Sequence, residues 1–114
     1  MGGATPAVAG TTGVERIAAV FAANRAAGRK ALAPFVTAGD PDADTCVAVL
    51  AALDRAGASL CELGVPYSDP IADGPVIQAS YTRALGRGIT LEGVFDIARR
   101  ATAACTMPIL AMAS

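Results

Sequence analysis

The sequence has no histidine, no tryptophan and only three cysteines among its 114 residues. Without histidine a Ser-His-Asp nucleophile is excluded, so Ser68 has no base to activate it. The cysteines are widely spaced and form no Cys-x-x-Cys pair, which argues against a disulfide framework or a zinc site. We expect no metal, and we expect Cys46, Cys61 and Cys105 to be small buried hydrophobic residues in a reducing compartment.

The sequence also lacks an excess of charge of either sign and any long apolar run. The chain carries 9 basic and 10 acidic residues, so it has no basic surface typical of nucleic-acid binding. No apolar run approaches the ~20 residues of a membrane-spanning helix. The first 13 residues lack the charged and apolar regions of a secretion signal. These absences predict a cytoplasmic protein with no nucleic-acid or membrane partner, and residues 1–13 are interpreted as a flexible tail.

Apolar runs and helical patterns alternate along the rest of the chain, which is 54% hydrophobic overall. Helical spacing of apolar residues predicts helices at about 14–26, 41–56 and 76–85, and a fourth that begins at Leu91. Short apolar runs predict strands at about 31–37, 59–65 and 107–113. This alternation favours an α/β fold with right-handed crossovers and a parallel sheet. Three strands make an incomplete α/β unit, so residues 14–114 are interpreted as part of a larger domain.

Several residues are typical of helix starts. Thr12 and Glu15 are three apart, as in a capping box. Asp40 is suited to cap the second helix, with Pro41 in its first turn. Thr90 is suited to cap the fourth helix.

Three carboxylates fall within CELGVPYSDPIADGP, residues 61–75. Glu62 lies near the end of a predicted buried strand, and Asp69 and Asp73 lie in the loop that follows. In parallel α/β sheets, sites gather at the carboxyl ends of strands. If the loop folds back over the strand, Glu62 and Asp73 can face one small molecule. Such a pair supports proton transfer, because a carboxyl group in apolar surroundings can give and take a proton near neutral pH.

Structural explanations for the same carboxylates remain open at this point. Glu62 is equally suited to an ion pair, with Arg83 or Arg87 as its partner. Asp69 precedes Pro70 and Asp73 precedes a Gly-Pro pair, so both are also typical turn formers. No Gly-x-Gly-x-x-Gly or P-loop motif occurs, and a nucleotide-binding loop is therefore unsupported.

Longer motifs add a specific resemblance. The segments PFVTAGDP (34–41) and ELGVPYSDPIADGPVIQ (62–78) closely resemble the α subunit of tryptophan synthase. RALGRGITLEGVFDIAR (83–99) and MPILAM (107–112) extend the likeness, which covers roughly residues 14–114. The resemblance implies a (β/α)8 TIM barrel, of which about the first three strands and their helices are present here.

The resemblance also implies a chemistry, a retro-aldol lyase step that cleaves indole-3-glycerol phosphate to indole and glyceraldehyde 3-phosphate. Glu62 matches the family's acid/base residue, Asp73 matches its indole N–H acceptor, and Phe35 matches a residue of its indole pocket. The loop that holds Pro66, Asp69 and Pro70 resembles the one that faces the β subunit. No cofactor is expected in the α subunit, since pyridoxal phosphate belongs to the β subunit.

The number of strands departs from the family's pattern. The family's phosphate-binding segments follow the seventh and eighth strands, and the loop that closes over substrate follows the sixth. None of these segments is in the sequence. We therefore expect this chain alone to bind substrate poorly, and the alternative to a lyase is an inactive fragment that at most binds the β subunit.

Overall fold

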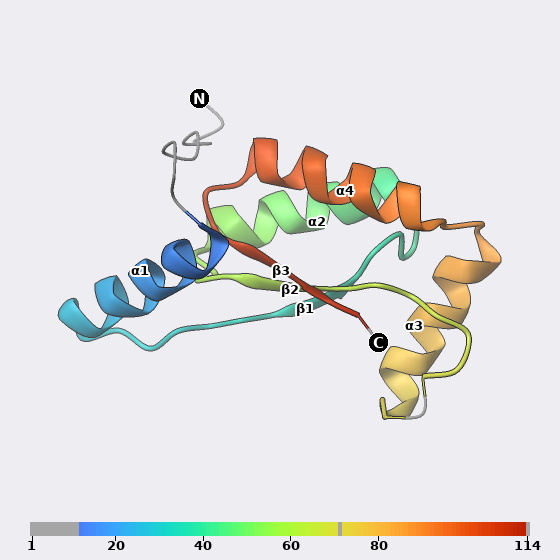
Figure 1. The fold of residues 1–114 in the computed structure, drawn as a ribbon, viewed down its shortest axis with the longest axis horizontal. Helices are drawn as coiled ribbons and strands as arrows, with labels where there is room; N and C mark the ends of the chain where they lie inside the picture. The colour runs from blue at the N-terminus through green and yellow to red at the C-terminus, as the bar shows by residue number, and fades with distance from the viewer. Residues whose placement is uncertain (1–11, 71, 114) are drawn as a thin grey trace.

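The computed structural model describes residues 12–70 and 72–113, which form four helices around a three-stranded sheet (Figure 1). Residues 1–11 of the predicted tail lie outside the described residues. The elements, in chain order, are α1 (Gly13–Ala26), β1 (Phe35–Thr37), α2 (Ala43–Ala56), β2 (Cys61–Gly64), α3 (Pro75–Gly86), α4 (Leu91–Ala104) and β3 (Ile109–Met112). Every helix and strand predicted from the sequence is present, although the strands are shorter than predicted.

The sheet is parallel, as predicted, and its strands follow the order β1-β2-β3. The register places Phe35 beside Glu62, and Glu62 beside Leu110. Neighbouring residues of a parallel sheet in register point to the same face. These three side chains therefore lie on one face of the sheet, in one row across all three strands.

The helices begin where short polar side chains satisfy free backbone N–H groups. Thr12 and Glu15 form the predicted capping box of α1. Thr90 caps α4 and accepts a hydrogen bond from the backbone N–H of Gly93 at 3.0 Å. The prediction that Asp40 caps α2 is wrong. Asp42 caps this helix instead and accepts from the N–H of Thr45 at 2.8 Å.

Helices α2 and α4 lie side by side on one face of the sheet, and no helix of the described residues packs flat on the opposite face (Figure 1). Leu50 of α2, Leu63 of β2 and Ile97 of α4 are fully buried between these layers. The three cysteines are also buried and free, which confirms that they pack as small hydrophobic residues. Burial raises the pKa of the Cys61 thiol from 9.0 to about 11.

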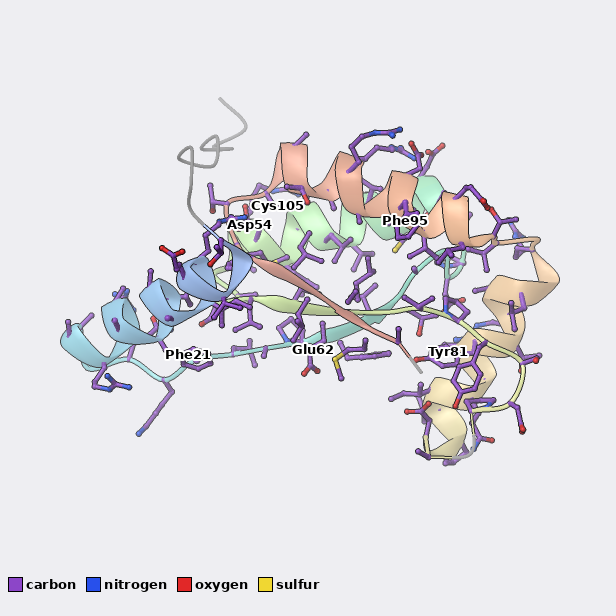
Figure 2. All side chains as sticks on the ribbon, viewed as in Figure 1. Phe21, Asp54, Glu62, Tyr81, Phe95 and Cys105 are labelled. Carbon is purple, nitrogen blue, oxygen red and sulfur yellow. The ribbon has the colours of Figure 1, made fainter. Side chains whose placement is uncertain are left out.

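Asp54 ties the end of α2 to the start of β3. Its carboxylate accepts hydrogen bonds from the backbone N–H of Thr106 at 3.0 Å, the Thr106 hydroxyl at 3.0 Å and the backbone N–H of Met107 at 2.9 Å. Figure 2 shows Asp54 beside Cys105, at the end of the sheet where the strands begin. The contact fixes where β3 enters the sheet and therefore supports the register that places Leu110 beside Glu62.

Helix α3 takes a different position from α2 and α4, at the carboxyl ends of the strands (Figure 1). It begins at Pro75, which suits the first helical position because proline has no N–H to leave unpaired. Among the helices that the structure describes, none is long and apolar enough to cross a membrane. The placement of α3 brings it, and the loop before it, over the end of the sheet where sites gather in α/β folds.

Candidate active site

Glu62 lies in the middle of β2 and points away from the helices that cover the sheet (Figure 2). Its neighbours Cys61 and Leu63 belong to the buried core, so side chains along β2 alternate between the two faces of the sheet. The Glu62 side chain is half-buried between Phe35 and Leu110 in the row across the sheet. Within the described residues its carboxylate has no ion-pair or hydrogen-bond partner, which leaves it available for a ligand.

The predicted structural explanation for Glu62, an ion pair with Arg83, is wrong. Arg83 instead pairs with Asp40, with Nε–Oδ1 at 2.9 Å and Nη2–Oδ2 at 3.0 Å. This bidentate ion pair joins the loop after β1 to helix α3. It explains why Asp40 does not cap α2, because the carboxylate is turned toward Arg83. Arg87, the second candidate, makes no ion pair with Glu62 either among the described contacts.

The Phe35 ring reaches over Gly64 of β2. A Cβ added to Gly64 would collide with Cζ of the Phe35 ring, and it would lie 2.9 Å from Cε2 and 3.1 Å from the Tyr81 hydroxyl. Glycine at position 64 therefore makes room for two aromatic side chains from different elements. Phe35 lies on the face that carries Glu62, while Tyr81 comes from α3 at the end of the sheet.

Asp73 lines a cavity of about 150 Å³ at the carboxyl ends of β2 and β3. The other lining residues come from the strand ends, the loop and α3: Val65, Tyr67, Ala72, Tyr81, Met112 and Ala113. The rings of Tyr67 and Tyr81 are tilted against each other with centroids 6.1 Å apart. A carboxylate at the edge of an aromatic and aliphatic cavity suits a flat apolar ligand that carries one hydrogen-bond donor.

The backbone of the Asp73 loop is held by a side chain from α3. The Gln78 amide donates to the carbonyl oxygens of Asp73 at 2.6 Å and of Pro70 at 3.2 Å. The Asp73 N–H also points to the Pro70 carbonyl at 3.3 Å, so these residues form a turn as well as a site. Asp73 is therefore a turn former and also lines the cavity, while its role toward a ligand stays a prediction.

The structure brings the predicted site residues together in two groups. Phe35 and Glu62 lie in one row on the sheet, and Asp73 lies in the cavity beyond the strand ends, whose described lining does not include Glu62. Gly64 connects the groups, because the Phe35 ring and the Tyr81 hydroxyl both approach it. A ligand that spans the two groups would extend from the centre of β2 over Gly64 into the cavity.

The residues predicted to face a partner lie in the loop between β2 and α3. Asp69 is exposed, while Pro66 and Pro70 are half-buried. Across the described ranges, no cluster of three or more histidine, cysteine, aspartate or glutamate side chains could hold a metal ion.

Sequence comparison decides the family. The profile described as tryptophan synthase alpha chain matches residues 21–114. This chain belongs to the tryptophan synthase alpha chain family. A tryptophan synthase alpha chain of Rhodopirellula baltica is 61% identical over 83 residues, which are 73% of this chain and 30% of that protein. One from Microcystis aeruginosa is 57% identical over 90 residues, or 79% of this chain and 34% of that protein.

Solved structures of tryptophan synthase alpha chains have the same arrangement. The subunit alpha of Legionella pneumophila superposes with a TM-score of 0.81 and 37% identity, over 85% of this chain and 37% of that one. The Pyrococcus furiosus chain, solved as an α2β2 complex, gives a TM-score of 0.68 and 45% identity over 72% of this chain and 35% of that one. The fold is therefore the predicted α/β fold, part of a TIM barrel. The chain spans about a third of the length of the tryptophan synthase alpha chains it matches.

Three features of this tryptophan synthase alpha family site were not predicted from the sequence. They are the two tyrosines that line the cavity, the Gln78 bridge and the ion pair of Asp40 with Arg83. The sequence does contain a signal for the tyrosines of the cavity, because the chain has only two tyrosines and they lie on either side of Asp73. No local sequence pattern indicates the Gln78 bridge or the ion pair, since each depends on how the loops fold onto α3.

Proposed function

We propose that this chain supplies the proton-transfer residues of a tryptophan synthase alpha reaction, the retro-aldol cleavage of indole-3-glycerol phosphate to indole and glyceraldehyde 3-phosphate. The observation that carries the proposal is the position of Glu62. Its carboxylate lies in the row between Phe35 and Leu110, on the sheet face away from α2 and α4, without a partner among the described residues. A half-buried carboxylate that no described residue engages is free to act on a ligand.

Each site residue has a distinct task in this proposal. Protonated Glu62 gives a proton to the indole ring carbon that bears the glycerol phosphate side chain. Asp73 accepts a hydrogen bond from the ring N–H and stabilises the positive charge that then develops on the ring. The carbon–carbon bond breaks, the adjacent hydroxyl becomes the aldehyde, and its proton returns to the Glu62 carboxylate. Phe35 forms an apolar wall against the ring, and this chemistry requires no cofactor from the chain.

The β subunit is the proposed protein partner. The Pyrococcus furiosus relative was solved as an α2β2 complex. The exposed Asp69, together with Pro66 and Pro70, offers the loop surface for this contact, and pyridoxal phosphate would belong to the partner. A soluble biosynthetic enzyme of this kind would act in the cytoplasm.

The experiment uses a chimera, since the chain spans about a third of its relatives. Residues 21–113 replace the matching segment of the Rhodopirellula baltica tryptophan synthase alpha chain, and indole release from indole-3-glycerol phosphate is measured. We expect an active chimera in which Glu62→Gln lowers kcat by about 10²–10⁴-fold, the usual contribution of one acid/base group. Glu92→Gln is the matched control, because Glu92 is exposed on α4, and it should keep full activity. Full activity of the Glu62→Gln chimera would refute the assignment.

A second candidate function is binding of the β subunit without catalysis, and the exposed Asp69 loop favours it. The test is capture of the 114-residue chain by an immobilised tryptophan synthase β subunit, with Asp69→Ala as the variant and Glu92→Gln as the control. Equal capture of the variant and the native chain, or capture of neither, would remove the loop from the proposed interface.

A further inference from the structure

The phenol of Tyr81 forms one wall of the cavity beside Asp73. Tyr81 is only 4% exposed, yet its hydroxyl has no hydrogen-bond partner among the described residues. The hydroxyl lines the cavity and approaches the backbone at Gly64, so it points toward the place where the two groups of site residues meet.

An unpaired acceptor lines the same cavity. The side-chain oxygens of Asp73 make no hydrogen bond to the described residues, although its backbone is fixed by Gln78 and Pro70. Asp73 is half-buried, and its side chain can rotate without any change in the turn. One cavity therefore contains a free donor on a rigid helix and a free acceptor on the loop that precedes this helix.

We propose that Tyr81 is a positioning residue for Asp73, whose carboxylate it orients by donating a hydrogen bond across the cavity. The bond occupies one carboxylate oxygen and leaves the other to accept from a ligand N–H. Hydrogen bonds to charged groups are among the stronger ones in proteins, so a single donor is sufficient to select one rotamer. The inference rests on the proposed function for its catalytic consequence, but not for the contact itself.

The electrostatics of Tyr81 agree with this arrangement. Burial is the main cause that raises the pKa of the Tyr81 hydroxyl, followed by the negative charge of Asp73 and then by Tyr67. An anion near a phenol disfavours the phenolate and therefore keeps the O–H available as a donor. The raised pKa of Tyr81 thus keeps its hydroxyl a neutral donor beside Asp73.

The contact can be tested without any enzymatic activity, because the chain has two tyrosines and no tryptophan. Tyr67→Phe leaves Tyr81 as the only tyrosine, and its ionisation is then followed by the ultraviolet absorbance of tyrosinate. Removing the charge with Asp73→Asn in this background should move the midpoint to lower pH. Asp69→Asn, which removes an exposed charge from the same loop outside the cavity, should leave the midpoint in place.

Two outcomes overturn the proposal: an unchanged midpoint in Asp73→Asn, or an equal shift in Asp69→Asn. Circular dichroism verifies that each variant is folded, and Asp73→Ser removes the same charge if the asparagine variant does not fold. The catalytic consequence is measured in the chimera, where Tyr81→Phe should lower kcat roughly tenfold with little change in KM. If the native chimera makes no indole, the proposed function fails while the titration still decides the contact between Tyr81 and Asp73.

Discussion

Replacing Gly64 with alanine is the sharpest test of how the aromatic side chains pack over β2. The added Cβ would overlap Cζ of Phe35 and lie within 2.9–3.1 Å of the Phe35 ring edge and the Tyr81 hydroxyl. Gly64 does not have a positive φ, so the substitution strains contacts and not the backbone. The Phe35 ring must therefore move. It also lines a groove of about 280 Å³ whose other walls include residues of α3.

The magnitude follows from two opposing effects. Overpacking a well-filled site typically costs about 1–3 kcal/mol. Alanine recovers roughly 0.5–1 kcal/mol because glycine loses more backbone entropy on folding. The midpoints of these ranges leave a net loss of about 1 kcal/mol, which lowers Tm by roughly 4–8 °C in a domain of this size.

The assay is thermal unfolding followed by circular dichroism, with Gly86→Ala as the matched control. Gly86 lies at the end of α3 with nothing within 4 Å of an added Cβ, so this change should be neutral or stabilising by up to about 1 kcal/mol. Phe35→Leu shortens the colliding ring and should recover part of the Tm lost in Gly64→Ala, a coupling that a double-mutant cycle measures. A Gly64→Ala protein as stable as the native chain would refute the packing argument.

Two further predictions concern the core and the contact that fixes β3. Asp54→Ala removes the acceptor for Thr106 and Met107 and should lower the free energy of unfolding in urea by about 2 kcal/mol. The control is Asp44→Ala, whose carboxylate is mostly exposed, and it should lower the free energy of unfolding by well under 1 kcal/mol. Equal losses in the two variants would contradict the role of Asp54. The pKa of Cys61 rises from 9.0 to about 11 on folding, so its contribution to stability is complete below pH 9 and is lost as the pH rises from about 9 to 11. Urea titrations across this range should show a falling free energy of unfolding with a shallower slope in Cys61→Ala; identical slopes would refute the burial argument.

The element order and the parallel sheet could be predicted from the sequence because they depend on local signals. Apolar periodicity and the capping box of Thr12 with Glu15 are each read within one segment. The cap of α2 was wrong because Asp40 and Asp42 are both good caps locally. The choice between them depends on Arg83, which is 43 residues away from Asp40 in the chain.

The composition of the site was only partly predictable for the same reason. Glu62, Asp73 and Phe35 were identified by motif, and their assigned roles remain predictions. Which of them share a cavity depends on the path of the loop from Val65 to Gly74, and no local pattern encodes that path. The structure separates Asp73 from the row that holds Glu62 and places Tyr81 beside Gly64 between them.

The two carboxylates are carried by parts of the molecule that should open at very different rates. β2 is the central strand, with backbone hydrogen bonds to β1 on one side and β3 on the other. Amide groups of such a strand exchange with solvent only in large opening events, whereas a loop held by one side chain opens locally at much lower free energy. Glu62 is therefore part of a stiff frame, and Asp73 belongs to a segment whose local opening is controlled largely by the Gln78 amide. Ligand entry could then reshape the Asp73 side of the site while the position of Glu62 stays constant.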